Sequence, residues 1–249
     1  MAGRRQAQRS SAPFLRPLTP LLSALLPFVL LTSAIRLEMS SLALYLRGFR
    51  VYSVAETTGL TSAQLAEAAT RLVRYFNTLA ETPQMIVSHV SGPAFDLYHD
   101  YELIHLADVK VLFAANSMIQ AVSLLLVVTI VLAGCAFGRR ADVYRALRQG
   151  AILTLLLLAL TALAFVIDFQ RMFVLFHLVA FDNSFWLLDP LTDYLIMLFP
   201  LGFWQDMFLL AGASTGLTAI GILTLATRAL QRRRPDASRN DAVTRARAV

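Results

Sequence analysis

Four stretches of almost continuous apolar residues dominate the hydrophobic pattern of the chain. A helix needs about 20 mostly apolar residues to cross the hydrocarbon core of a bilayer. We therefore predict four transmembrane helices, which cover residues 18–37, 111–134, 151–167 and 207–227. The first stretch follows a basic start, as a signal peptide does, but no A-x-A cleavage site follows it, so we predict that it is retained.

The segment between the third and fourth apolar stretches, residues 168–206, has a different pattern. It is rich in aromatic and acidic residues, and Pro190 and Pro200 interrupt it. Proline removes a backbone donor and disfavours a continuous helix. We therefore predict that this loop lies at the membrane surface or re-enters the membrane without spanning it.

The segment between the first and second apolar stretches, residues 38–110, is too long for a simple connection. Residues 49–54 partly alternate between apolar and polar side chains, as a strand does. Thr61 and Gln64 have the spacing of a capping box. Apolar residues then recur at helical spacing until Pro83, which predicts a helix.

Residues 85–90 and 94–98 of the same segment are predicted to be two strands, joined by a turn at Ser91-Gly92-Pro93. Together these signals predict a small α+β cap between the first and second spans. The predicted fold class is an all-α membrane protein with four transmembrane helices and this extracytoplasmic cap.

Composition agrees with a membrane protein. Apolar residues make up 57% of the 249 residues, charged residues only 15%, and the mean hydropathy is +0.61. A soluble domain has about 25% charged residues, so an ordinary cytosolic enzyme is not expected. A single cysteine, Cys135, excludes an intramolecular disulfide or a CxxC metal site.

The formal charge of +6 comes from arginines that are concentrated in three segments, residues 1–17, 135–150 and 228–249. Positive residues near span ends mark the cytoplasmic side. We therefore predict a multi-pass protein of the cell membrane, with cytoplasmic basic tails at both termini and a cytoplasmic loop at 135–150. The cap and the 168–206 loop are then extracytoplasmic, and nucleic-acid binding is not expected.

All the histidines, which are His89, His99, His105 and His177, fall outside the predicted spans on the extracytoplasmic side. Two of them lie where a loop meets a span, His105 before residue 111 and His177 after residue 167. Histidines from two loops can therefore meet at the outer leaflet.

Acidic residues accompany both of these histidines. Glu102, His105 and Asp108 are spaced by three, so in a helix they share a face, and a carboxylate there can fix the tautomer of the imidazole. Asp193 either supports the histidines or caps a short helix at residues 194–196. The residues alone permit a catalytic pair, interfacial histidines without chemistry, or a two-histidine metal site, although no HxxxH or HExxH pattern favours the last.

Several other polar and aromatic residues could either line the site or have a structural role. Asn116 and Gln120, one turn apart in the second span, either line the site or bond another span. Trp186 either lines the site or, like Trp204, anchors the chain at the membrane interface. A literal G-x-S-x-G at residues 212–216 lies inside an apolar span, where it is expected to be a small-residue packing face rather than a nucleophile elbow.

The two histidine motifs together resemble the Lit family, the bacterial lipoprotein intramolecular transacylases. The resemblance is carried by His105-Leu106-Ala107-Asp108-Val109-Lys110, by Phe176-His177, and then by Phe181, Trp186, Asp189-Pro190, Thr192-Asp193, Leu195-Ile196 and Phe199-Pro200. It covers nearly the whole chain, including the four spans and the cap. It implies that His105 and His177 are the essential histidines.

The resemblance also implies a reaction and a partner. Such an enzyme moves an acyl chain from a glycerol ester of a lipoprotein's N-terminal diacylglyceryl-cysteine to its α-amine, and leaves the lyso form. The expected partners are membrane-anchored lipoproteins. No metal and no cofactor is expected, because conversion of an ester to an amide is downhill.

Proton transfer is the remaining requirement of this chemistry. An α-ammonium with a pKa of about 7.7–8.0 must lose a proton to an imidazole near 6.5, a mismatch that costs roughly 1.8 kcal/mol. We assign His105 as the base, because Glu102 and Asp108 can orient it, and His177 as oxyanion donor or acid; the reverse assignment stays open. The alternatives are a histidine-based membrane lipid hydrolase and a non-enzymatic membrane scaffold.

Overall fold

The computed structural model describes residues 18–89 and 92–232. Its helices are α1 Leu18–Met39, α2 Leu42–Val51, α3 Val54–Thr58, α4 Ser62–Asn77, α5 Asp100–Ala136, α6 Arg140–Ala180, α7 Tyr194–Leu198 and α8 Leu201–Gln231. A hairpin of β1 Ile86–Ser88 and β2 Ala94–Asp96 lies between α4 and α5. The N-terminal basic tail and most of the C-terminal one lie outside the described residues.

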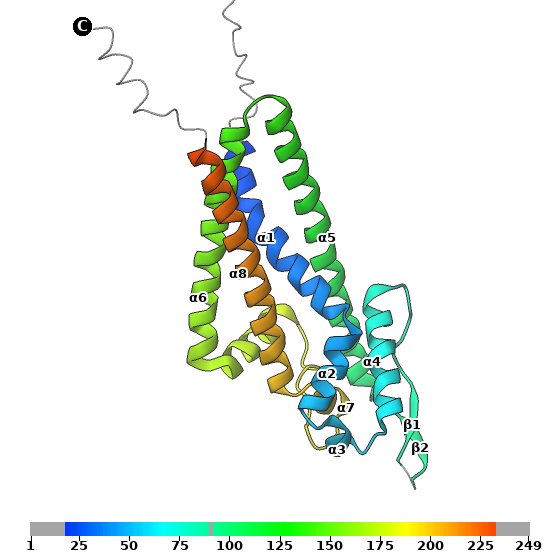
Figure 1. Ribbon diagram of the computed structural model, residues 1–249. Helices are drawn as coiled ribbons and strands as arrows, with labels where there is room; N and C mark the ends of the chain where they lie inside the picture. Colours follow the sequence, from blue (N-terminus) through cyan, green and yellow to red (C-terminus); the bar gives the residue numbers. More distant parts are fainter. Residues whose placement is uncertain (1–17, 90–91, 233–249) are drawn as a thin grey trace, which may run out of the picture.

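Four helices of the described part, α1, α5, α6 and α8, are long and apolar enough to cross a membrane. They form a bundle in which α1 packs against each of the other three (Figure 1). The beginning of α1, the α5–α6 connection and the end of α8 lie at one end of this bundle. The cap of α2, α3, α4 and the hairpin lies at the other end, as expected for four spans with a cap after the first.

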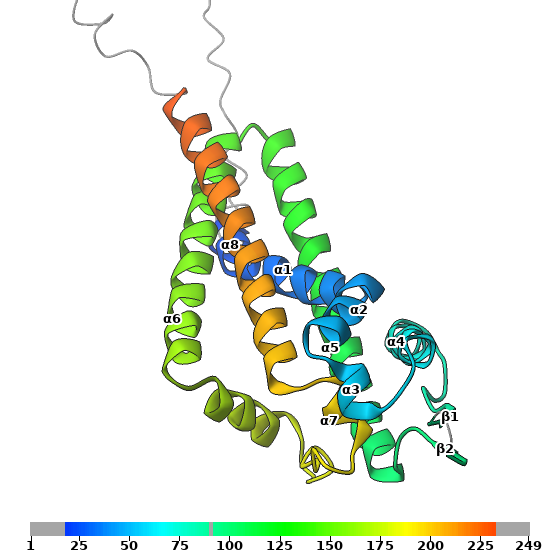
Figure 2. The ribbon, with the colours of Figure 1, turned by 60° about the horizontal axis from the view of Figure 1, so that its bottom comes forward.

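Helix α6 bends at Asp168, one residue after the predicted end of the third span. The backbone of Asp168 leaves the helical region (φ −164°, ψ 92°), and its Oδ1 accepts a hydrogen bond from the backbone N–H of Arg171 at 2.9 Å. The carboxylate therefore caps the helical segment that continues to Ala180. Figure 2 shows this segment leaving the axis of α6 on its way to α7.

The predicted strand at residues 49–54 is wrong, because these residues form the end of α2 and the beginning of α3. Phe49 and Val51 would lie on the same face of a strand, but Phe49 is buried and Val51 is 54% exposed, so their burial does not follow a strand pattern. Ser53 adopts a left-handed conformation (φ 49°) that separates the two helices. The capping box is confirmed, since Thr61 and Gln64 cap α4 reciprocally. The pairing of the two predicted strands is confirmed over shorter ranges, with Val87 opposite Phe95, and Ser91 of the predicted turn lies outside the described residues.

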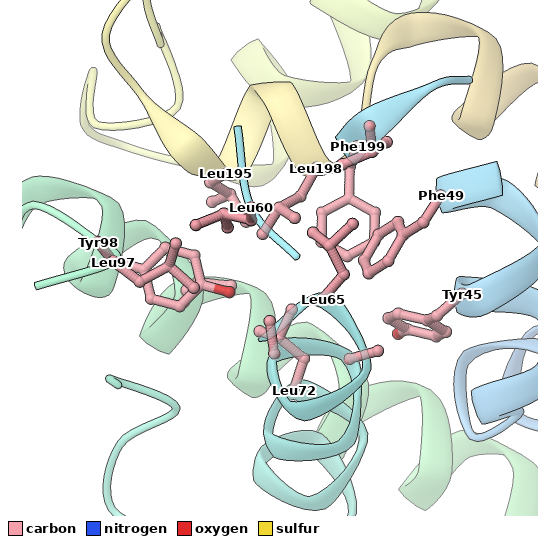
Figure 3. Packing of buried hydrophobic residues seen from close by; sticks show 14 of the residues in the cluster. Tyr45, Phe49, Leu60, Leu65, Leu72, Leu97, Tyr98, Leu195, Leu198 and Phe199 are labelled. Atoms are coloured by element: carbon pink, nitrogen blue, oxygen red, sulfur yellow. The ribbon is translucent and has the colours of Figure 1, made fainter. Parts of the chain in front are cut away.

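One apolar core joins the cap to the segment that precedes α8. Figure 3 shows side chains of α2, α4 and α7 meeting there, among them Tyr45, Leu72 and Leu198. Because α7 belongs to this core, the chain that follows the bend of α6 is fixed against the cap.

The small residues that pack α8 are neighbours of the glycines in the G-x-S-x-G sequence. Ala211, Thr215 and Ala219 are buried, whereas a Cβ added at Gly212 would meet no atom within 4 Å. The motif lies within one continuous helix, so it has no nucleophile elbow. The predicted packing face is correct in kind, but it includes Thr215 and not Gly212.

Candidate active site

His105 and His177 face each other at the cap end of the bundle. His105 lies in the second turn of α5 and His177 in the last turn of α6, and their ring centroids are 6.0 Å apart. Each residue is only 7% exposed. Both line a cavity of about 140 Å³ whose other walls come from α1, α2, α4, α7 and α8 and from the loop before α7. The structure thus brings the two predicted histidines into one apolar cavity.

The tautomer of His177 follows from its backbone contact. Its Nδ1 lies 2.7 Å from the carbonyl oxygen of Phe173, one turn earlier in α6. A carbonyl only accepts, so Nδ1 carries the hydrogen and donates it. In the neutral ring, Nε2 therefore holds the free lone pair, which is the atom a general base needs.

His105 differs from His177 in the hydrogen bonding of its Nδ1 atom. Within residues 18–89 and 92–232, its buried Nδ1 has no hydrogen-bond partner. The edge of its ring contacts Phe181 at a centroid distance of 4.9 Å. A buried polar atom without a partner costs about 1–3 kcal/mol. His105 therefore brings an unsatisfied ring nitrogen to the residues that line the cavity.

Aromatic rings enclose His177. Phe173 lies 4.3 Å away between ring centroids, Trp186 5.1 Å and Phe181 5.5 Å. Trp186 thus lines the cavity beside His177. Trp204, which the sequence suggested as an interfacial anchor, lines the same cavity. Apolar walls of this kind weaken the solvation of charge within the cavity.

The contacts of Glu102 correct its predicted role of orienting His105. Its side chain is fully buried, and its carboxyl oxygens accept from the backbone N–H of His99 and from that of Leu195, both at 2.7 Å. Glu102 is the third residue of α5 and forms the capping box of this helix with His99. Its second oxygen caps α7, so Glu102 joins the beginnings of two helices.

Asp193 belongs to the same network as Glu102, and within the described residues its hydrogen bonds go to neither His105 nor His177. It is 2% exposed and accepts from the hydroxyl of Tyr101 at 2.5 Å, the hydroxyl of Thr192 at 2.9 Å and the N–H of Asp189 at 2.8 Å. Burial alone would raise the pKa of Asp193, but these hydrogen bonds outweigh burial and lower it. Asp193 holds the N-cap position of α7, but the capping carboxyl is that of Glu102.

His99, Glu102 and Asp193 have the spacing of a cation site, since one ligand atom of each lies within 4.8 Å of the others. Backbone N–H groups already occupy both oxygens of Glu102, and three donors occupy those of Asp193. Hydrogen bonds therefore account for this cluster, and we assign no metal to it.

Asp108 forms a hydrogen bond with Asn183, a residue that the sequence analysis did not single out. Its Oδ2 accepts from Nδ2 of Asn183 at 2.8 Å, which ties the chain after α6 to α5 one turn from His105. The only sequence signal for Asn183 is an isolated amide within an aromatic stretch.

Asn116 and Gln120 bond another helix, the second of their two interpretations. Asn116 donates to the carbonyl of Thr32 at 3.2 Å, and Gln120 donates to the hydroxyl of Ser33 at 3.0 Å. Both acceptors lie on α1, so these amides hold α5 against α1, and neither residue lines the histidine cavity.

Comparison with known proteins gives one family. The family described as lipoprotein intramolecular transacylase Lit matches residues 20–204 of the chain. The solved structure of the membrane-integral Lit from Bacillus cereus aligns with a TM-score of 0.74 at 19% identity, over 89% of this chain and 97% of that one. A variant of that protein with a histidine replaced by alanine aligns with a TM-score of 0.71 at 18% identity, over 89% of this chain and 96% of that one. No curated protein matches the chain.

Proposed function

The chain belongs to the Lit family of lipoprotein intramolecular transacylases, and from this premise we propose that it moves an acyl chain within the N-terminus of membrane lipoproteins. The substrate is the diacylglyceryl-cysteine, and the product is the N-acyl, S-monoacylglyceryl form. The observation that carries this proposal is the pair of buried histidines that face each other across an apolar cavity.

The reaction is balanced without a further reactant. The α-amine nitrogen attacks an ester carbonyl of the glycerol, the C–N bond forms, and the C–O bond to glycerol breaks. One proton leaves the amine and one reaches the glycerol oxygen. Because amine and ester belong to one molecule, a cavity that holds them in a reactive pose supplies a large effective molarity.

We assign His177 as the base and His105 as the donor, the reverse of the assignment favoured from the sequence. The Nδ1–H of His177 donates to Phe173 and leaves Nε2 as the acceptor for the amine proton. The unpartnered Nδ1 of His105 can donate to the tetrahedral oxyanion or to the leaving oxygen. The sequence argument depended on Glu102 orienting His105, and Glu102 is engaged elsewhere.

The surroundings of the histidines favour transfer to the amine over hydrolysis. The rings around His177 and the low exposure of both histidines keep water from competing with the amine. We further propose that the cap end of the bundle is extracytoplasmic and that both termini are cytoplasmic, since the arginine-rich 135–150 loop lies at the opposite end.

The test is tandem mass spectrometry of the N-terminal lipopeptide of a reporter lipoprotein co-expressed with the protein. Intact mass does not change in an intramolecular transfer, but fragmentation locates the acyl chain on nitrogen or on glycerol. We expect the N-acyl form with the native chain and the unchanged diacylglyceryl form with His177→Ala or His105→Ala. His89→Ala is the matched control, because His89 is an exposed histidine outside the cavity.

Two outcomes would contradict the proposal. Free fatty acid without N-acylation would identify a hydrolase. N-acylation that survives loss of either cavity histidine would remove the assigned chemistry.

A further inference from the structure

A second groove lies between α1, the beginning of α2 and α8. Its volume is about 400 Å³, and it is distinct from the histidine cavity. Leucines of all three helices form its apolar lining, among them Leu30, Leu44 and Leu210. Hydroxyl side chains and one carboxyl, that of Glu38, also line it. A groove of this kind suits a ligand with a long apolar part and a polar end.

Two residues that line this groove each have a buried polar atom without a partner within the described residues. These atoms are Oε1 of Glu38, a residue only 7% exposed, and Oγ1 of Thr215, a residue only 1% exposed. By contrast, the hydroxyls of Ser214 and Thr218 in the same groove donate to the carbonyls of Ala211 at 3.1 Å and of Ser214 at 2.8 Å. Glu38 is the penultimate residue of α1, at the cap end of an apolar span, and an ionisable side chain that is buried there is costly and marks a functional site.

The groove and the histidine cavity share a wall. Glu38 lines the groove, and the next residue, Met39, lines the cavity. Leu44 lines the groove, and the next residue, Tyr45, lines the cavity. The corner between α1 and α2 therefore lies between the two spaces, which are adjacent to each other.

We propose that this groove binds the acyl chain of the diacylglyceryl substrate that is not transferred, with the carboxyl of Glu38 at the ester of that chain. A charged carboxylate without a cation is costly among apolar side chains. The form that fits the groove is therefore the neutral carboxyl, which donates to an ester carbonyl. By holding one chain, the groove presents the other ester to the histidines. This inference rests on the proposed function and adds the determinant of which ester reacts.

The test is photocrosslinking of a diacylglyceryl lipopeptide that carries a diazirine in the retained chain, with purified His177→Ala protein in nanodiscs. The inactive background keeps the substrate unconverted, so the readout does not depend on turnover. We expect crosslinks on the segments 30–37 and 210–218. Thr218→Trp, which fills the groove, should reduce these crosslinks at least tenfold. Leu217→Trp is the control, because Leu217 is 71% exposed and does not line the groove.

Two variants of Glu38 test the polar contact. Glu38→Leu removes the donor and should weaken lipopeptide binding about tenfold, which corresponds to about 1.4 kcal/mol. Glu38→Gln keeps an N–H donor and should bind within about twofold of the parent protein, a difference of about 0.4 kcal/mol. Equal loss in both variants would indicate a cationic partner and overturn the ester assignment.

Failure of this inference can be told apart from failure of the proposed function. Crosslinks spread over the lipid-facing surface, or full competition by ordinary phospholipid, would overturn the subsite while leaving N-acylation by the native chain intact. Crosslinks confined to the groove in a protein that never forms the N-acyl product would retain the subsite and overturn the transacylase.

Discussion

Replacement of Glu102 by glutamine separates a structural role of this carboxyl from a role in proton transfer. Glu102 is fully buried, and its two oxygens accept the N–H groups of His99 and Leu195. Glutamine keeps one oxygen acceptor but turns an NH₂ group toward the other N–H. One buried donor is then unsatisfied, which costs about 2 kcal/mol.

For a chain of this length, a loss of about 2 kcal/mol lowers the unfolding temperature by roughly 4–8 °C. The measurement is thermal unfolding of the purified protein in detergent, together with the pH dependence of transacylation. We expect Glu102→Gln to unfold earlier and to keep the pH profile of the native chain, because the carboxyl contacts α7 and not His105. Alanine should cost more, since it leaves both N–H groups without a partner.

Glu67→Gln is the matched control. Glu67 lies on the exposed face of α4, where it pairs with Arg71, and its loss should change stability by less than about 0.5 kcal/mol. A Glu102→Gln protein with native stability and a shifted pH profile would refute this reasoning and restore the carboxyl to the proton-transfer chemistry.

Three further predictions follow from single contacts. Gly48→Ala should lower stability by about 1–3 kcal/mol in a denaturation assay, because the added Cβ would overlap the ring of Phe203; native stability would show that the ring moves freely. Lys110→Met should loosen the cap and increase hydrogen exchange in α4, since Nζ of Lys110 donates to the carbonyl of Ala80 at 2.6 Å; unchanged exchange would contradict this. Asp193 has a lowered pKa in the folded protein, so its contribution to stability is present above its unfolded pKa and is lost as pH falls through the folded value. The stability gap between the native chain and Asp193→Asn should therefore narrow in acid, and a constant gap would refute the assignment.

In the cap, the sequence predicted correctly those features that depend only on residues close together in the chain. The capping box of Thr61 and Gln64 needs only two side chains three positions apart, and it was found from the sequence. The alternation at residues 49–54 was misleading, because six residues fit one and a half turns of helix as well as a short strand. Burial of Phe49 against the ring of Phe199, which lies between α7 and α8, decided for the helix.

The sequence by itself determined the four apolar helices, the cap and the two histidines at its junctions, because composition and periodicity are properties of each segment alone. The tertiary structure decided which atoms those residues present. Glu102 caps a helix that begins 92 positions later, and the bend at Asp168 turns His177 toward His105. The hydrogen-bond donors and packed side chains around a residue decide which rotamer it adopts. In this protein those neighbours come from segments far apart in the sequence, which are brought together only in the folded bundle.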